Sequence, residues 1–199
     1  MFLKIIASAS IGYLLGSVVW AILISLLVFK EDIRSKGSGN SGATNAARVY
    51  GFWFGWLTFW GDFSKGVAAC ALGGLIGGAP GLAAAGLACM LGHHFPLYFR
   101  FRGGKCVSVG LALALMIDYR IALAAIGVFL VLFLITRIVS LGSIAGAATV
   151  GAASVMIAPE LVLKISGAIA AIAVIALHHS NIKRLLRGEE KKITFGKRK

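Results

Sequence analysis

The sequence is poor in charged residues, and acidic residues are the scarcest of them. Only 14% of its 199 residues are charged and 59% are hydrophobic, whereas an average soluble domain is about 45–50% apolar. This composition excludes an ordinary soluble fold and indicates an all-α, polytopic integral membrane protein. Seven Asp and Glu residues against 20 Lys and Arg leave a net charge of +13. We expect this excess to face membrane lipid and not nucleic acid, because anionic headgroups attract cytoplasmic Lys and Arg.

Cysteine is also scarce, and the motifs of metal and covalent chemistry are missing. Cys70, Cys89 and Cys106 form no CxxC or Cys/His spacing, so neither a disulfide framework nor a zinc site is expected. His93 and His94 lack a carboxylate at metal spacing. No DxxDG array supports magnesium-dependent phosphotransfer, and no GxSxG elbow supports an acyl-enzyme. We therefore expect no metal and no cofactor.

Long apolar stretches alternate with short polar ones along the whole chain. Because a helix needs roughly 20 apolar residues to cross the hydrocarbon core, the pattern predicts seven transmembrane helices in a single domain, 1–199. The predicted spans are 3–29, 52–77, 80–99, 107–117, 120–137, 142–158 and 161–178. The first is too long for the apolar region of a signal peptide and is interpreted as a retained helix. The fourth is short, tilted or embedded without crossing.

The distribution of basic residues predicts the orientation. With seven spans and the N-terminus outside, 16 Lys and Arg residues fall inside and three fall outside, namely Lys4, Arg120 and Lys164. This asymmetry agrees with the positive-inside rule and places the C-terminus in the cytoplasm. Omitting the fourth span would move Arg137 and the basic tail outside, so the charges favour seven spans.

Small residues repeat every four positions in two predicted spans. Ser8, Gly12 and Gly16 form one ridge, and Gly142 and Gly146 form another. Such ridges let helix backbones approach closely. We expect packing within one chain, and hence a monomer, with a dimer interface as the alternative.

Two ionisable residues lie deep in the second predicted span. Asp62 and Lys65 are three positions apart and form either a structural ion pair or part of a polar site. A transporter for an organic phosphate would need more polar residues near the midplane of the bilayer. A lipid-binding protein without enzymatic activity is a third possibility. Because the other polar groups gather on one face, we favour an enzyme that works at the membrane surface.

Three polar segments on the predicted cytoplasmic side hold most of the basic residues. Segment 1 is 33–48, segment 2 is 100–105 and segment 3 is 178–192. They combine glycines, small hydroxyl and amide side chains, and cations, a mixture that suits phosphate. Without metal or nucleotide motifs, this pattern favours group transfer onto a phosphorylated acceptor through positioning and electrostatics.

Segment 1 contains the stretch GSGNSGATNAAR at 37–48. Its glycines let backbone N–H groups converge on an anion, and the guanidinium of Arg48 matches phosphate geometry. We expect 43–50 to form a short helix whose N-terminus faces the same anion. A dinucleotide-binding loop is disfavoured, because the stretch follows a membrane helix and not a strand. A solvated polar turn is the simpler alternative.

Segments 2 and 3 carry the other candidate groups. In segment 2, GGK at 103–105 precedes an apolar helix and suits an anion, although an ordinary basic flank explains it equally well. In segment 3, His178 and Asn181 share a helix face, and His178 suits proton transfer near neutral pH. An amphipathic interfacial tail is the alternative. The turn that follows the fifth long span brings Ser140 and Ser143 to the same side.

These segments resemble the motifs of the bacterial acyl-phosphate:glycerol-3-phosphate acyltransferase family, GSGNxGATNxxR, GGKG and HRxNIxRLxxGxE. Residues 37–48 fit the first motif throughout, Cys106 replaces a glycine of the second, and His179 replaces an arginine of the third. The resemblance implies transfer of a fatty acyl group from acyl-phosphate to the sn-1 hydroxyl of glycerol 3-phosphate, giving lysophosphatidic acid and phosphate. It also implies a bacterial inner membrane, a cytoplasmic active site, and neither acyl-CoA nor metal.

The resemblance and the chemistry of the segments together predict the site. The expected catalytic residues are Ser38, Arg48, Lys105, His178 and Asn181. The expected substrate-binding residues are Gly37, Gly39, Asn40, Gly42, Thr44, Asn45, Gly103, Gly104, Ser143, Arg184 and Glu190. We expect Arg48 and Lys105 to clamp phosphate, helped by backbone N–H groups. These N–H groups are those around Gly39, Gly103 and Gly104.

The remaining predicted roles concern orientation and proton transfer. Ser38 and Asn45 are expected to orient substrate oxygens, and His178 and Asn181 to hold the acceptor hydroxyl or the leaving phosphate. The proton acceptor is either His178 or a substrate phosphate, whose second pKa near 6 suits the task.

Overall fold

The computed structural model describes residues 1–193, and within that range it contains only helices and connecting loops. The α-helices are α1 (Phe2–Gly16), α2 (Trp20–Val28), α3 (Ala43–Tyr50), α4 (Phe52–His94), α5 (Val107–Ile117), α6 (Tyr119–Thr136), α7 (Val139–Ile157), α8 (Leu161–Leu177) and α9 (His179–Leu186). Two short 3-10 helices are η1 (Ile33–Ser35) and η2 (Leu97–Phe99). The predicted all-α class is therefore confirmed for the described residues. The last basic residues of the predicted cytoplasmic tail, at 194–199, lie outside them.

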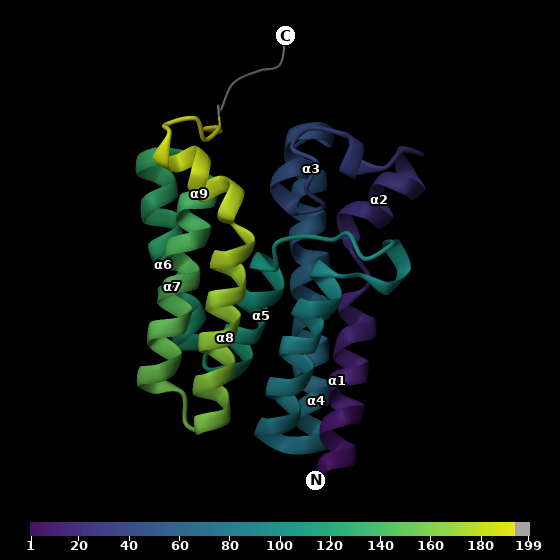
Figure 1. Cartoon of the computed structure of the whole chain (residues 1–199), viewed down its shortest axis with the longest axis vertical. Helices are drawn as coiled ribbons and strands as arrows, with labels where there is room; N and C mark the ends of the chain where they lie inside the picture. The colour runs from purple at the N-terminus through teal and green to yellow at the C-terminus, as the bar shows by residue number, and fades with distance from the viewer. Residues whose placement is uncertain (194–199) are drawn as a thin grey trace.

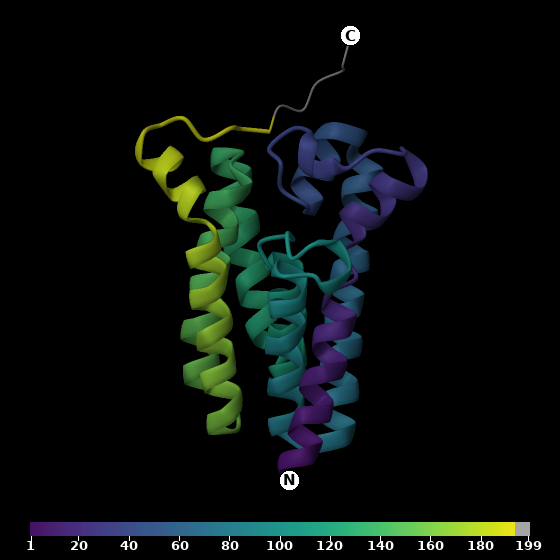
Figure 2. The same cartoon turned by 45° about the vertical axis from the view of Figure 1, so that its right-hand side comes forward.

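The helices form two groups joined by α5. Figures 1 and 2 show α1 to α4 on one side and α6 to α9 on the other, with the short helix α5 between them. Helix α5 contacts α4, α6, α7 and α8, and buries an apolar cluster with them. Segments 1 and 3 lie at the end of the molecule opposite the N-terminus (Figure 2), and segment 2 follows the end of α4. The fold thus brings segments 1 and 3 to a common end, as the predicted topology requires.

Helix α4 contains a sharp break that reverses the chain (Figure 1). Gly77 and Gly78 have non-helical backbone angles, and Gly73 packs closely against Gly81 across the turn. By length and composition, four helical stretches are suited to cross a membrane, with α4 counted as one of them. A fifth is added if α8 and α9, which meet at 57°, form one bent span. Helix α5 is apolar but shorter, and its bounds are those predicted, 107–117.

Small residues allow the close packing of α1 on the second half of α4. A Cβ atom at Gly12 would overlap the backbone of Ala85, and one at Gly16 would overlap that of Cys89. Gly142 in α7 packs in the same way against Phe129 of α6. Both predicted ridges of small residues are therefore used within the chain, as expected.

The first apolar stretch, predicted as one helix over 3–29, is broken between α1 and α2. The break frees backbone carbonyls that a membrane interior would leave without partners. Lys65 is the hydrogen-bond partner of two of these carbonyls. Its Nζ donates to the carbonyl of Gly16 at 2.9 Å and also to that of Val18. Asp62 holds the same ammonium at 2.9 Å. Of the two roles predicted for this pair, the contacts support the structural one.

Candidate active site

The loop of segment 1 is built around the buried side chain of Asn45. Its Oδ1 accepts from the backbone N–H of Ser38 at 2.8 Å, and its Nδ2 donates to the carbonyl of Lys36 at 3.0 Å. Gly37 has φ +63°, and a Cβ atom there would overlap Asn45 Oδ1. Both polar ends of the Asn45 side chain therefore shape the loop. The exposed Ser38 is better placed than Asn45 to contact a substrate.

The short helix predicted over 43–50 is confirmed as α3, and it presents Arg48. Arg48 lies in the last turn of α3 and is partly exposed. Helix α3 packs on α4, where Gly55 gives Ala47 room to approach. The remaining predicted residues of this segment are also partly exposed. They are Asn40, Gly42 and Thr44.

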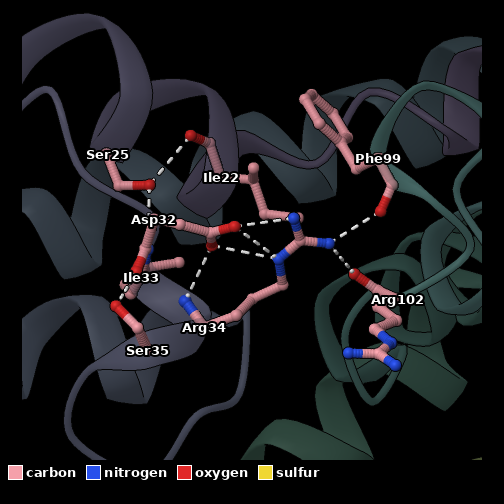
Figure 3. A network of polar contacts seen from close by, with 8 residues as sticks. All are labelled: Ile22, Ser25, Asp32, Ile33, Arg34, Ser35, Phe99 and Arg102. Atoms are coloured by element: carbon pink, nitrogen blue, oxygen red, sulfur yellow. Dashed lines mark hydrogen bonds and ion pairs between the residues drawn. The ribbon is translucent and has the colours of Figure 1, made fainter.

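Arg34 joins segment 1 to segment 2 (Figure 3). Its Nε and one terminal nitrogen donate to the carboxylate of Asp32, and the other terminal nitrogen donates to the carbonyls of Phe99 at 2.7 Å and Arg102 at 3.0 Å. The hydrogen bonds from Arg34 hold the pKa of Asp32 below its usual value, although partial burial opposes this. Sequence reasoning did not single out Arg34. Its carbonyl partners on Phe99 and Arg102 lie more than 60 positions away along the chain, and no local pattern reports them.

The two glycines of segment 2 are needed for close backbone packing. The N–H of Gly103 donates to the carbonyl of His94 at 2.9 Å, and that of Gly104 donates to the carbonyl of His93 at 3.0 Å. Gly39 likewise donates to Lys36 at 2.9 Å. All three of these N–H groups therefore bond to backbone carbonyls, and the predicted binding of phosphate by N–H groups around these glycines stays a prediction. The glycines instead let the loop lie on the end of α4, which positions Lys105.

We expect Gly103→Ala to impair the enzyme although it removes no polar side chain. The added methyl group would overlap the carbonyl oxygen of His93, a backbone atom that cannot rotate away. Because overpacking costs about 1–3 kcal/mol, kcat/KM should fall about tenfold as the loop shifts. Gly127→Ala is the control, since nothing lies within 4 Å of its added Cβ. Steady-state rates and thermal midpoints of both variants test this; normal values for both would contradict it.

Segment 3 folds back so that Glu190 becomes the centre of a polar network. Its carboxylate accepts from Ser140 Oγ at 2.7 Å, from Asn181 Nδ2 at 2.6 Å and from Arg184 Nε at 2.6 Å. The side chain is only 9% exposed. Burial alone would raise the pKa of Glu190, but the three hydrogen bonds, that from Arg184 first, outweigh it and lower the pKa. The carboxylate is therefore charged at neutral pH and fixes three side chains at once.

Lys105 joins segment 2 to segment 3. Its Nζ donates to Asn181 Oδ1, so Asn181 lies between Lys105 and Glu190. Burial, and then the positive charge of Arg184, lower the pKa of Lys105. An ammonium has three donors, and the contact with Asn181 uses one of them. Lys105 is therefore a partly buried cation that an arriving anion would stabilise.

His178 lies one turn before Asn181, at the bend between α8 and α9. The residue is buried, and its Nδ1 lies 2.7 Å from the carbonyl of Val174. Because a carbonyl only accepts, Nδ1 carries the proton and Nε2 is left with a lone pair. Ser143 is also buried, one turn along α7 from Ser140, which bonds to Glu190. Ser140 joins the network although only Ser143 was predicted as a site residue.

We expect Glu190→Gln to lower kcat/KM about tenfold or somewhat more. An amide keeps the shape but cannot accept from all three donors, and hydrogen bonds to a charged group contribute about 1.5–3 kcal/mol each. Because the folded-state pKa of Glu190 is lowered, the network should persist above its ordinary pKa of 4.5 and be lost as pH falls below it. Glu189→Gln, an exposed neighbour, is the control. Equal rates in wild type and Glu190→Gln would remove Glu190 from the site.

Comparisons with known proteins show the family to which the chain belongs. A family model described as glycerol-3-phosphate acyltransferase matches residues 6–188. Relatives with that name include one from Finegoldia magna, 36% identical over 193 residues with 96% of this chain and 98% of the relative covered. Another, from Synechococcus elongatus, is 40% identical over 202 residues with 97% and 96% covered.

Solved structures give the same result for the fold. A crystal structure of PlsY, described as an integral membrane glycerol 3-phosphate acyltransferase in its glycerol 3-phosphate form, superimposes with a TM-score of 0.90 at 33% identity, covering 96% of each chain. The lysophosphatidic acid form of the same protein superimposes with a TM-score of 0.87 at 32% identity, covering 96% of this chain and 95% of that one. The chain therefore belongs to the glycerol-3-phosphate acyltransferase family and is an integral membrane acyltransferase.

Proposed function

We propose that the protein transfers a fatty acyl group from acyl-phosphate to the sn-1 hydroxyl of glycerol 3-phosphate in phospholipid biosynthesis. The products are 1-acyl-glycerol 3-phosphate, which is lysophosphatidic acid, and inorganic phosphate. The observation that carries this proposal is the contact of Lys105 with Asn181, which joins segments 2 and 3 beside His178. Within residues 1–193, this contact combines a cation, Lys105, that keeps free donors with a base, His178, whose Nε2 keeps its lone pair.

In the proposed step, the sn-1 oxygen of the acceptor attacks the acyl carbonyl carbon. The bond between that carbon and the phosphate oxygen breaks, and phosphate leaves with its electron pair. Lys105 and Arg48 stabilise the negative charge that develops on the carbonyl and phosphate oxygens. The hydroxyl proton passes to His178 Nε2 and then to the leaving phosphate. Direct transfer to a substrate phosphate, with a second pKa near 6, is the other route.

We also propose the membrane arrangement that the charge pattern predicts. Seven crossings result if α1 and α2 count as one, the two halves of α4 as two, and α5, α6, α7 and the bent pair α8–α9 as one each. The N-terminus then lies outside, and the three polar segments lie on the cytoplasmic face of a bacterial inner membrane. A short α5 suits this arrangement. Helix α5 begins at segment 2, and segment 2 lies on the end of α4, below segment 1 (Figure 2). We expect a monomer, since the ridges of small residues are used within the chain.

The lowered pKa of Lys105 predicts an alkaline limit on activity. The ammonium is charged below its pKa, so kcat/KM should fall as pH rises through a value lower than the ordinary 10.5. Lys105→Arg should move this limit upward, because arginine stays protonated. Initial rates against pH, corrected for spontaneous hydrolysis of the donor, measure it. An alkaline limit at the same pH in both enzymes would assign it to another group.

A comparison of donors tests the proposed reaction. Purified protein is given glycerol 3-phosphate with either palmitoyl phosphate or palmitoyl-CoA, and lysophosphatidic acid is measured. We expect product from palmitoyl phosphate and none from palmitoyl-CoA. A sample without protein serves as the control for protein-independent acyl transfer. Efficient use of palmitoyl-CoA with no product from palmitoyl phosphate would refute the donor assignment.

A further inference from the structure

A second basic site lies outside the network of Lys105, Asn181 and Glu190. It is a cavity of about 400 Å³ lined by Asp32, Arg34, Arg100 and Arg102. Three arginines and one aspartate give it a formal charge of +3 − 1 = +2. None of the four residues belongs to the predicted catalytic or substrate-binding set.

The hydrogen bonds divide the four lining residues into a structural pair and two unpaired cations. Arg34 and Asp32 satisfy each other, and the remaining terminal nitrogen of Arg34 is used by the carbonyls of Phe99 and Arg102. Figure 3 shows the guanidinium of Arg102 pointing away from Asp32. Within residues 1–193, the guanidinium groups of Arg100 and Arg102 make no hydrogen bond or ion pair. The excess positive charge of the cavity is therefore carried by two side chains that are free to bind an anion.

The loop that carries these two arginines is held in one shape. The N–H groups of Phe99 and Phe101 both donate to the carbonyl of Pro96, at 3.2 and 3.0 Å. Arg34 fixes the carbonyls on either side of Arg100. Because the loop is already ordered, binding an anion would cost little conformational entropy.

Exposed apolar side chains lie next to the two cations along the chain. Leu97 is 46% exposed, Tyr98 53% and Phe101 54%. A site for a soluble anion gains nothing from such neighbours. Arginine and aromatic side chains together are typical of the membrane–water interface, where the ring lies at headgroup level and the cation reaches the phosphate. The loop also follows α4, one of the helical stretches suited to cross the membrane.

We propose that this cavity binds the phosphate of an anionic membrane lipid. Arg100 and Arg102 contact the phosphate oxygens, and Leu97, Tyr98 and Phe101 contact the glycerol and the first part of the acyl chains. The Arg34–Asp32 pair orients the loop and does not contact the ligand. The site is separate from the one at which acyl transfer is proposed, and it does not depend on the identity of the acyl donor.

The full chain in detergent tests this by native mass spectrometry during titration with dioleoylphosphatidylglycerol or dioleoylphosphatidylcholine. We expect one phosphatidylglycerol to be retained in preference to phosphatidylcholine. Arg100→Gln with Arg102→Gln should weaken its retention about 30-fold. The matched control is Lys183→Gln with Arg187→Gln, which removes two exposed cations from segment 3 and should change retention less than about threefold if the cavity and not the overall charge is responsible.

Three results would overturn the proposal. Equal losses in the two double variants would mean a diffuse attraction of anionic lipid to the basic surface. Equal retention of the two lipids would mean no recognition of charge. Displacement of the lipid by millimolar inorganic phosphate would assign the cavity to a soluble anion. Both double variants should keep wild-type acyl transfer in detergent, which separates this test from a failure of folding or of the proposed reaction.

Discussion

Replacing Lys105 with methionine should lower kcat/KM by about 100-fold or more. Methionine keeps most of the length of the side chain and removes the charge. Loss of one preorganised donor to a developing oxyanion typically costs about 100- to 1,000-fold. Lys105 is placed for that task, since the packing of Gly103 and Gly104 on α4 holds its backbone and Asn181 holds its ammonium.

A second lysine, Lys183, provides the control for this result. Lys183→Met makes the same chemical change on the exposed face of α9 and should change the rate less than twofold. Lys105→Arg keeps the charge and should recover part of the activity. Rates for Lys105→Met within threefold of wild type, with a normal thermal midpoint, would remove Lys105 from the transition state.

Replacing His178 with glutamine should lower kcat by about 100- to 10,000-fold if its Nε2 accepts the hydroxyl proton. Glutamine can still donate to the carbonyl of Val174, which now holds Nδ1 at 2.7 Å, but it cannot take a proton. A histidine accepts a proton only when it is neutral, so the part of the acid-side decline of kcat that comes from protonation of His178 should disappear in this variant. The loss of the Glu190 network below pH 4.5 should remain.

The adjacent His179 provides the control for His178. His179 is exposed and its Nδ1 lies 3.2 Å from the carbonyl of Ala176, so His179→Gln should behave like wild type. If His178→Gln kept near-normal turnover and the wild-type pH dependence, a substrate phosphate would be the proton acceptor. The two routes are thus separated by one variant and its neighbour.

The sequence predicted the break in α4, which falls at the boundary between the predicted spans 52–77 and 80–99, but not the break between α1 and α2. Helix α5 has the bounds predicted for it, since its apolar run is short and bordered by polar residues. The break between α1 and α2 could not be predicted, because residues 17–19 are as apolar as their surroundings. What permits that break is the ammonium of Lys65, which lies more than 40 positions away along the chain. A local pattern contains no information about a partner at that distance.

The same limit applies to the candidate site. The residue types of segments 1 to 3 were sufficient to predict phosphate chemistry, because glycines, amides and cations are uncommon together in a membrane protein. The role of each individual residue was not predictable. The N–H groups around Gly103 and Gly104 were predicted to bind phosphate, but those of the two glycines themselves bond to the end of α4. Asn45 appeared as a substrate contact, yet both of its polar ends shape its own loop. Which donors are already used depends on tertiary contacts.

The most direct test of the proposed acyl transfer is the stoichiometry of its products. Purified wild-type protein in detergent is incubated with palmitoyl phosphate and glycerol 3-phosphate, and inorganic phosphate and 1-palmitoyl-glycerol 3-phosphate are measured together over time. The proposed acyl transfer predicts equal amounts of the two products, and no enzyme-dependent phosphate release without glycerol 3-phosphate. Phosphate release that does not depend on the acceptor, or no release with both substrates present, would contradict it.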